Sequence, residues 1–355
     1  MKAWRLEKAG GRLSLEEIPV PVVRPGSALV RLAAAPVLSY MGDVLAGKIA
    51  TIYRFPDHAF TPGTNGAGTI EAVGSGVFHL RAGQRVVLNP HFVADERGVD
   101  PAQILIGLTR IGPDSAPVQE EWPDGTFAEY ALMPASALTP AGDVLAPERL
   151  ATLGKFTVPY GGFVRIGLQA GETVIVNGAT GYFGSAAAML AAAMGAGRVV
   201  AAGRDAATLA AVARAVGPRG ATVTLAGDVA ADAAALRSAA DGGAHAAIDL
   251  VGRAGDSGST LATLRALRRG GRLALMGSMT VPLSVGYSDL VVNDLTIVGQ
   301  FMYPKDALAR LIALAAGGVL DLARIELRSF PLAELPAAMA HAAGMRGLQA
   351  TVLRM

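Results

Sequence analysis

The apolar positions of this 355-residue chain follow two patterns, one before and one after about residue 149. In the first part, short strand-like runs are separated by turn residues such as Pro25 and Gly26, and proline, glycine and β-branched residues are frequent. The runs occupy residues 28–32, 68–73 and 85–88. This pattern predicts a mainly β domain with irregular connections over residues 1–147.

In the second part, short apolar runs alternate with alanine-rich stretches of helical length. The six predicted strands are residues 173–177, 198–202, 222–225, 246–250, 272–276 and 296–301. The predicted helices between them include residues 185–194, 206–216 and 230–240. Parallel strands need long crossover connections, so the alternation predicts an α/β fold with a doubly wound parallel sheet over residues 148–302. Residues 303–355 begin with a helix at 307–316, and we expect them to return to the first domain.

Composition narrows the class of protein. Apolar residues make up 52% of the chain and charged residues 17%, which is enough to build buried cores in about two domains. The net charge of +2 indicates neither a nucleic-acid partner nor an anionic membrane. Cysteine is absent, which excludes disulfides and thiolate chemistry. Because no signal-peptide pattern or membrane-spanning run is present, we expect a cytoplasmic protein.

The first strand of the predicted sheet runs directly into a glycine-rich turn. Ala179 replaces the first glycine of the GxGxxG pattern, whereas Gly181 and Gly184 keep the other two. Gly181 lets the backbone approach a pyrophosphate, and Gly184 lets the next helix pack closely on the strand. The pattern predicts a dinucleotide site, with a purely structural turn as the alternative. The predicted cofactor-binding residues of this turn are Asn177, Gly178, Ala179, Thr180, Gly181, Tyr182, Phe183 and Gly184.

The end of the second predicted strand indicates which dinucleotide is bound. An NAD-binding site tends to carry Asp or Glu here to accept from the ribose 2′-hydroxyl. This chain has Gly203, which leaves room for a 2′-phosphate, and then Arg204, which can pair with it. The residues therefore predict NADP(H) as cofactor, although Asp205 weakens the preference and Arg204 could instead be a solvated residue at a helix start.

With these features, the chain resembles the medium-chain dehydrogenase/reductase superfamily over nearly its whole length. The resemblance implies a GroES-like catalytic domain, a Rossmann domain and a cleft between them. Zinc alcohol dehydrogenases and zinc-free quinone oxidoreductases both belong to this superfamily. Besides the glycine turn, the motifs that carry the resemblance are residues 24–32, 62–68, 73–77, 82–86, 124–130 and 270–273.

The chain departs from the zinc branch of that superfamily at every ligand position. The three positions carry Leu38, Thr64 and Gly154, and residues 91–122, where a cysteine-rich lobe is expected, hold no cysteine. Without a Lewis acid, polarising a carbonyl falls to hydrogen-bond donors. The resemblance therefore implies a zinc-free enzyme without any bound metal, on the quinone or enone reductase side.

The resemblance also suggests where the proton donor lies. A Ser or Thr two residues after the first zinc ligand relays the proton in zinc enzymes, and this chain has Tyr40 there. Tyr40 is the first candidate for the catalytic donor, with packing in the cleft wall as the alternative, and Asp43 could pass protons to solvent. Tyr53 is the second candidate donor, and His58 and His91 are further ones.

A third group of residues is expected around the nicotinamide. Thr157 precedes the first Rossmann strand, where the family approaches that ring. Ligands of open α/β sheets bind beyond the carboxyl ends of the strands, so the residues that end strands four to six are expected to line the ring, unless they form ordinary turns. These residues are Val251, Gly252, Met276, Gly277, Ser278, Phe301 and Met302.

The predicted function is transfer of hydride from NADPH to a quinone, enone, aldehyde or ketone. Two alternatives remain, namely a zinc-free alcohol dehydrogenase and a catalytically silent NADPH-binding sensor or structural protein. Residues 295–301 form an apolar strand at the predicted sheet edge, and pairing of two such edges predicts a homodimer, as in the family. We expect small-molecule substrates and neither nucleic-acid nor membrane partners.

Overall fold

The computed structural model describes residues 1–49 and 53–355, and these divide into two compact units. Unit 1 contains Met1–Gly154, Glu326–Met345 and Ala350–Met355. Unit 2 contains Lys155–Ile325 and Arg346–Gln349. The chain therefore passes from unit 1 to unit 2 twice, once after Gly154 and again for a four-residue piece close to the C-terminus.

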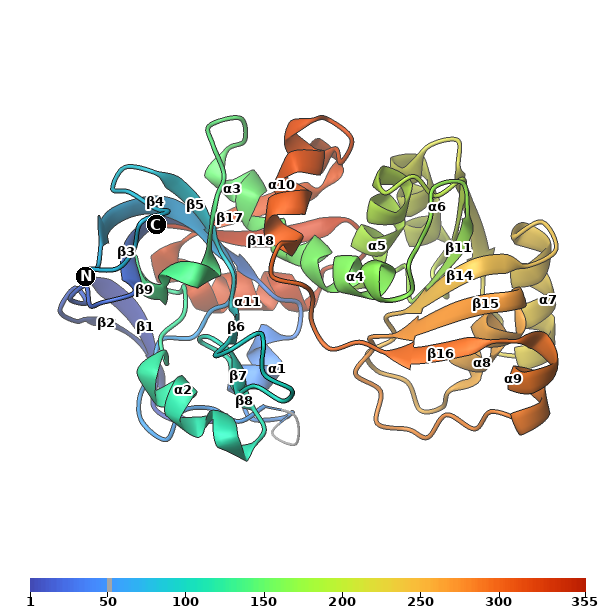
Figure 1. Cartoon of the computed structure of the whole chain (residues 1–355), viewed down its shortest axis with the longest axis horizontal. Coiled ribbons are helices and arrows are strands. Elements are labelled where there is room, and N and C mark those ends of the chain that lie inside the picture. The colour runs from blue at the N-terminus through green and yellow to red at the C-terminus, as the bar shows by residue number, and fades with distance from the viewer. Residues whose placement is uncertain (50–52) are drawn as a thin grey trace. The chain divides into compact units, whose positions relative to one another are not determined.

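Unit 1 is built on a seven-stranded sheet in the order β10-β5-β4-β3-β18-β17, with β9 also paired to β3 (Figure 1). The strand β3 (Ser27–Val37) pairs antiparallel with β4, β9 and β18, so the C-terminal strand lies beside one near the N-terminus. The other elements are β1 (Lys2–Leu6), β2 (Leu13–Glu17), α1 (Met41–Leu45), β4 (Gly66–Val73), β5 (Arg85–Leu88), β6 (His91–Val93), β7 (Gln103–Leu105), β8 (Thr109–Ile111), α2 (Ala116–Glu121), β9 (Tyr130–Pro134), β10 (Leu138–Pro140), α3 (Pro147–Ala151), β17 (Glu326–Pro331), α11 (Leu335–Ala343) and β18 (Gln349–Arg354).

The core of unit 1 follows from the residue types of these strands. Branched and aromatic side chains suit a half-buried pleated surface, and Val30 of β3 and Val86 of β5 are fully buried in one cluster. Three short strands, β6, β7 and β8, form a separate sheet in the region that was expected to replace a cysteine-rich lobe. The mainly β domain predicted from the sequence is therefore confirmed.

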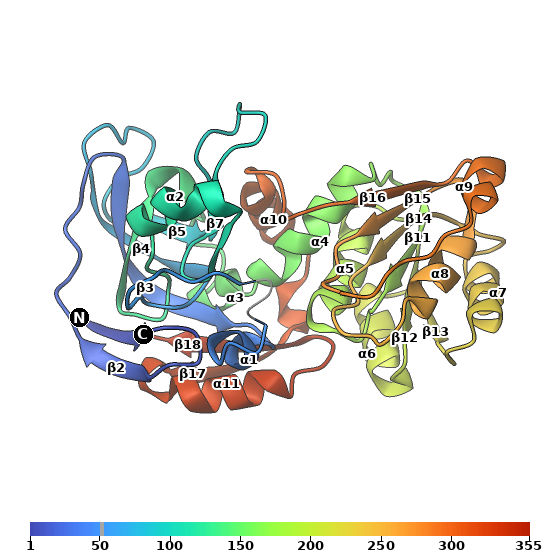
Figure 2. The ribbon, with the colours of Figure 1, turned by 90° about the horizontal axis from the view of Figure 1, so that it is seen from below.

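Unit 2 is a six-stranded parallel sheet in the order β13-β12-β11-β14-β15-β16 (Figure 2). The helices α5 and α6 pack against each other, as do α7 and α8, and this is the doubly wound arrangement that the alternation predicts. The bounds are α4 (Gly154–Arg165), β11 (Thr173–Asn177), α5 (Tyr182–Ala193), β12 (Arg198–Gly203), α6 (Ala206–Val216), β13 (Gly220–Thr224), α7 (Val229–Ala239), β14 (Ala244–Asp249), α8 (Gly258–Arg265), β15 (Leu267–Leu275), α9 (Tyr287–Asn293), β16 (Thr296–Gly299) and α10 (Ala307–Ala316).

Several element ends differ from the expected ones. Helix α5 begins at Tyr182 instead of residue 185, because the residues after Gly181 already adopt helical geometry. Strand β16 ends at Gly299, two residues earlier than expected, and β13 begins at Gly220. Within the described ranges, no helix is long and apolar enough to cross a bilayer.

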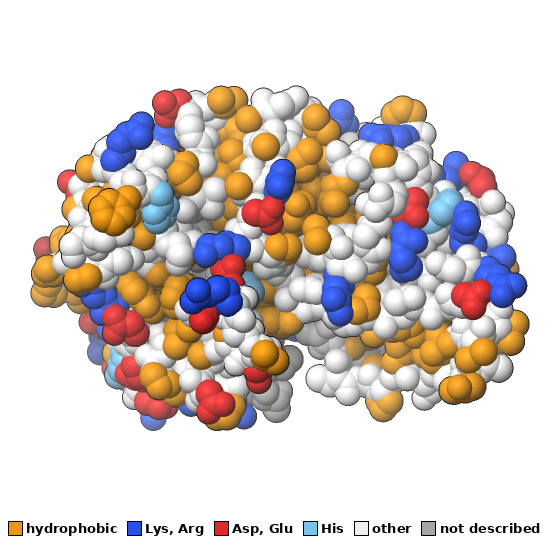
Figure 3. Space-filling model, in the orientation of Figure 1, with side chains coloured by type: hydrophobic (Ala, Val, Ile, Leu, Met, Phe, Trp, Pro, Cys, Tyr) orange, Lys and Arg blue, Asp and Glu red, His pale blue; other side chains and the backbone are white. Residues whose placement is uncertain are grey.

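Strand β16 lies at the edge of the unit 2 sheet, as predicted. Next to it in the chain, α9 exposes three large apolar side chains, Tyr287, Val291 and Val292, whose exposed fractions are 85%, 57% and 67%. Figure 3 shows apolar side chains gathered over β16 and α9. An open edge strand beside an apolar surface is a feature that proteins usually cover.

Candidate functional site

The glycine turn of unit 2 requires glycine at two positions. Strand β11 ends at Asn177, and Gly178 follows with a φ of +80°. A Cβ atom on Gly184 would lie 2.1 Å from the carbonyl oxygen of Gly178, so only glycine permits this contact between turn and helix. The residue with positive φ is thus Gly178, one position before the glycine that Ala179 replaces.

The glycine turn leads directly into the N-terminus of helix α5. Gly181 is the N-cap of this helix and supplies no side-chain acceptor for the first N–H groups. Those N–H groups have no intrahelical partner, and with the helix dipole they favour an anion. Tyr182 is buried and stacks edge-on to Phe183, with ring centroids 5.0 Å apart.

The end of β12 carries the residues predicted to select the cofactor. A Cβ on Gly203 would lie 2.7 Å from Cγ2 of Thr180, so the Thr180 side chain already fills part of the space beside this glycine. Arg204 is exposed. Asp205 is the N-cap of α6, and its carboxylate accepts from the backbone N–H of Thr208 at 2.7 Å. This bond lowers the pKa of Asp205 and directs its charge to the helix.

The residues expected around the nicotinamide come together at the carboxyl ends of β14, β15 and β16. A Cβ on Gly277 would lie 2.1 Å from the carbonyl oxygen of Val251, and one on Gly252 would lie 3.4 Å from Oγ of Ser278. The helix α4 packs equally closely on this edge, because its glycines contact Met276 and the Met302 carbonyl. Met302 adopts a φ of +53°, and Phe301 is 46% exposed. Thr157 of α4 is buried.

A buried polar cluster next to the glycine turn was not predicted. Asn177 donates from Nδ2 to Asp249 at the end of β14 (3.0 Å) and to Ser259 (3.2 Å). Among the described residues, the buried Oδ1 of Asn177 has no donor, which leaves an acceptor available beside the turn. Burial raises the pKa of Asp249, although Thr260, Val251 and Asn177 all donate to it. An Asp that ends an apolar strand was the available signal.

Lys155, at the start of α4, is the second residue that was missed. Its side chain is fully buried, and its Nζ donates to the carbonyl oxygens of Gly347 and Gln349. A lysine inside the apolar run of residues 150–158 was the only hint in the sequence, because the two carbonyls belong to a segment nearly 200 positions away.

In unit 1, the two tyrosine candidates lie side by side. Tyr40 is the N-cap of α1, and its ring centroid is 6.5 Å from that of Tyr53. A side-chain hydrogen bond joins them, and burial raises the pKa of Tyr53 more than this bond lowers it. The carboxylate of Asp43 accepts from Lys48 at 3.0 Å. Which phenol acts as donor stays a prediction, but the two form one hydrogen-bonded pair.

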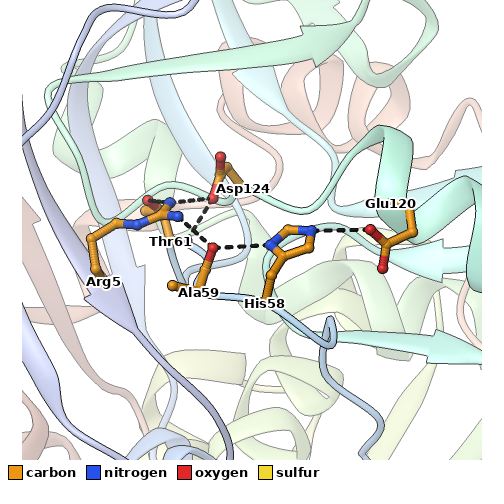
Figure 4. Close-up of polar contacts among 6 residues, drawn as sticks. All are labelled: Arg5, His58, Ala59, Thr61, Glu120 and Asp124. Carbon is orange, nitrogen blue, oxygen red and sulfur yellow. Dashed lines mark hydrogen bonds and ion pairs between the residues drawn. The ribbon is translucent and has the colours of Figure 1, made fainter.

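Both histidine candidates are held in polar contacts of unit 1. The ring of His58 bonds the Ala59 carbonyl and the Glu120 carboxylate, each at 3.1 Å (Figure 4). Arg5 bonds the same carbonyl and also Asp124 (Figure 4). His91 bonds Gln103 at 3.1 Å. A role of either histidine in proton transfer stays a prediction.

The positions at which the resemblance places zinc ligands do not fit a metal. Leu38 and Thr64 are buried, and the Thr64 hydroxyl has no hydrogen-bond partner among residues 1–49 and 53–355. A Cβ on Gly154 would lie 2.5 Å from Oδ1 of Asn65, so the Asn65 amide occupies the space beside Gly154. In that same part of the chain, no three His, Cys, Asp or Glu side chains gather as a metal site would require.

Two family models match this chain, one in each unit. Residues 24–143 match the alcohol dehydrogenase GroES-like domain, and residues 183–317 match the zinc-binding dehydrogenase domain. The chain belongs to the medium-chain dehydrogenase/reductase superfamily, as its motifs predicted.

Similar proteins include named enzymes at low identity. An L-threonine 3-dehydrogenase from Stenotrophomonas maltophilia is 31% identical over 214 residues, which are 56% of this chain and 56% of that protein. The match therefore spans little more than half of this relative. An alcohol dehydrogenase from Cupriavidus necator is 27% identical over 92% of this chain and 91% of its own length. The solved alcohol dehydrogenase from Thermus sp. ATN1 is 25% identical, covers 100% of this chain and 99% of its own, and superposes with a TM-score of 0.82.

Proposed function

We propose that this protein is an NADPH-dependent, zinc-independent oxidoreductase that reduces a quinone, an enone, or an aldehyde or ketone. The choice of NADPH as the cofactor is supported by the residues at the end of β12. There Arg204 is exposed beside Gly203, while the next residue, Asp205, is engaged as a helix cap. A 2′-phosphate would meet a cation without a competing carboxylate turned toward it.

The residues of unit 2 fit the dinucleotide. The N-terminus of α5 would hold the pyrophosphate, and Arg204 would hold the 2′-phosphate. The exposed glycine and serine positions that follow β15 would flank the nicotinamide. When bound, NADPH supplies the hydride that the chain itself cannot supply.

The tyrosine pair of unit 1 would provide the proton side of the reaction. Tyr40 donates a hydrogen bond to the substrate oxygen and so draws electron density from the carbon that accepts the hydride. Tyr53 is hydrogen-bonded to Tyr40, so a second phenol can take part in the transfer of the proton. Asp43 is then a route to solvent. The substrate gains one hydride at carbon and one proton at oxygen or at the neighbouring carbon.

We propose a reaction without zinc because the residues at the three ligand positions do not suit a metal. A metal at this point would need ligands where Leu38 and Thr64 are buried and where Asn65 fills the space next to Gly154. The full-length similarity to an alcohol dehydrogenase favours one second candidate, a zinc-free alcohol dehydrogenase that runs in the opposite direction.

One assay separates these candidates. Oxidation of NADPH and of NADH is followed at 340 nm with panels of quinones, enones and aldehydes, and reduction of NADP⁺ is followed with a panel of alcohols. Turnover with NADPH and an electrophilic acceptor supports the proposal. Turnover with alcohols alone supports the second candidate. A protein that binds NADPH but turns over none of these compounds would be a sensor or structural protein.

We also propose that two copies associate through the edge of the unit 2 sheet. Antiparallel pairing of β16 with its copy would satisfy the open backbone groups of the edge. The same contact would cover the apolar face of α9, including Tyr287 and Val292. The expected assembly is a homodimer.

A further inference from the structure

Unit 2 contains a buried lysine that neither the cofactor contacts nor the proton path explains. The Nζ of Lys155 donates to the Gly347 carbonyl at 2.7 Å and to the Gln349 carbonyl at 3.0 Å. It also lies 4.3 Å from the centroid of the Tyr182 ring, at the head of α5. The amine thus joins three parts of unit 2, namely α4, the glycine turn and the segment Arg346–Gln349.

Packing alone does not account for a lysine at this position. The side chain is fully buried, and no carboxylate pairs with it within the part of the chain that the structure describes. Desolvation lowers the pKa of Lys155 to about 7, so the fold opposes the charged form. An apolar side chain of the same length would fill the space without this cost. What distinguishes lysine from such an apolar side chain is that its amine donates hydrogen bonds to two carbonyl oxygens.

The segment that Lys155 holds lies directly on the glycine turn. The N–H of Gly347 donates to the Thr180 carbonyl at 2.9 Å, and the Gly347 carbonyl accepts from Ser185 of α5 as well as from Lys155. A Cβ on Gly347 would lie 2.8 Å from Cγ2 of Thr208 in the first turn of α6. Gly347 thus touches the turn after β11 and the helix after β12 at once.

We propose that Lys155 is a positioning residue for dinucleotide binding, which acts by fixing Gly347 against the pyrophosphate-binding turn. One amine holds the carbonyls of Gly347 and Gln349 and so fixes residue Gly347, whose N–H donates to the carbonyl of Thr180, three residues after Asn177. This inference rests on the proposed function, because it requires that the turn binds a dinucleotide. It does not require that the dinucleotide is NADPH.

Because NADPH and NADH share the pyrophosphate, a change at the glycine turn should affect the binding of both. NADPH and NADH differ at the ribose near Arg204 and have the same pyrophosphate, so loosening the turn should weaken both to the same degree. We expect Lys155→Met to raise the dissociation constants of NADPH and NADH each about tenfold, as for the loss of one well-placed hydrogen bond. Their ratio should remain that of the parent protein.

The experiment measures both dissociation constants on the full-length protein through the fluorescence of the bound reduced dinucleotide. Lys8→Met serves as the matched control, because Lys8 is exposed and the substitution is the same. Ser185→Ala provides a second test that does not depend on the folding of Lys155→Met. It removes the other donor to the Gly347 carbonyl and should raise both constants about threefold.

The outcomes distinguish this inference from the proposed function. If the parent protein binds neither dinucleotide, both are overturned. If the parent binds one or both and the Lys155 and Ser185 variants bind as tightly, only the role of Lys155 is overturned, even if the melting temperature falls. A loss confined to NADPH would also overturn it, because that result would place the effect at the 2′-phosphate.

Discussion

Replacing Lys155 by methionine should change how the stability of the protein depends on pH. In the folded protein the pKa of Lys155 is about 7, because burial disfavours the ammonium ion, whereas an unfolded chain has a lysine pKa of about 10.4. Between these two values the unfolded state binds more protons than the folded state. The free energy of unfolding of the parent therefore rises with pH over this range and falls as pH is lowered toward 7.

The size of the effect follows from the shift. A difference of about 3.5 pKa units corresponds to about 5 kcal/mol over the whole range, at about 1.4 kcal/mol per unit. Between pH 7 and pH 9, where most other groups are constant, about 2–3 kcal/mol should develop. Lys155→Met lacks the titrating amine, so its stability should not show this rise. The difference between the two proteins isolates Lys155 from all other groups.

The assay must report on unit 2. Both tryptophans, Trp4 and Trp122, lie in unit 1, so tryptophan fluorescence would follow the other unit. Denaturant unfolding followed by circular dichroism at 222 nm, with calorimetry to separate transitions, suits the helices of unit 2. A parent-minus-variant difference that stays flat from pH 6 to pH 9 would show that the amine keeps an ordinary pKa, and the reasoning from burial would be wrong.

Four further predictions concern the cofactor, the donor, the metal and the assembly. Arg204→Ala should raise the Michaelis constant for NADPH about tenfold to a hundredfold in steady-state kinetics and leave that for NADH nearly unchanged; equal losses for both cofactors would contradict the assignment. Tyr40→Phe should lower kcat about a hundredfold with NADPH affinity retained, and unchanged turnover would shift the donor role to Tyr53, tested by Tyr53→Phe. Elemental analysis should find no stoichiometric zinc, and chelators should not alter activity; one tightly bound zinc per chain would refute this. Sedimentation should show a dimer that Val292→Glu weakens, and a monomer at all concentrations would rule out pairing through β16.

Much of the fold could be predicted because it depends on local patterns. Six apolar runs separated by helical stretches predict the parallel sheet of unit 2, since each strand and each crossover shows its own periodicity. The glycine turn is equally local, as Gly178 and Gly184 meet within seven residues. Element ends were less certain, because the first turn of α5 depends on how the turn after β11 closes.

The candidate site was only partly visible in the sequence. Arg204 could be named as a candidate because it directly follows Gly203 at the end of β12, and its contact with a cofactor stays a prediction. The role of Asp205 could not be decided, since the same residue can cap α6 or face the ribose, and the hydrogen bond to Thr208 decides it. Likewise, Tyr40 and Tyr53 were separate candidates, and only the tertiary structure shows the hydrogen bond between their side chains.

By itself, the sequence determined the superfamily and the two kinds of domain, because both depend on residue identity at positions set by short motifs. Tertiary structure alone decided what surrounds Lys155 and what fills the space at Gly154. The carbonyls that Lys155 binds are more than 190 residues away, and the Asn65 amide beside Gly154 comes from the residue directly before β4. Contacts between residues so far apart depend on how whole layers pack, and no periodicity within the chain encodes them.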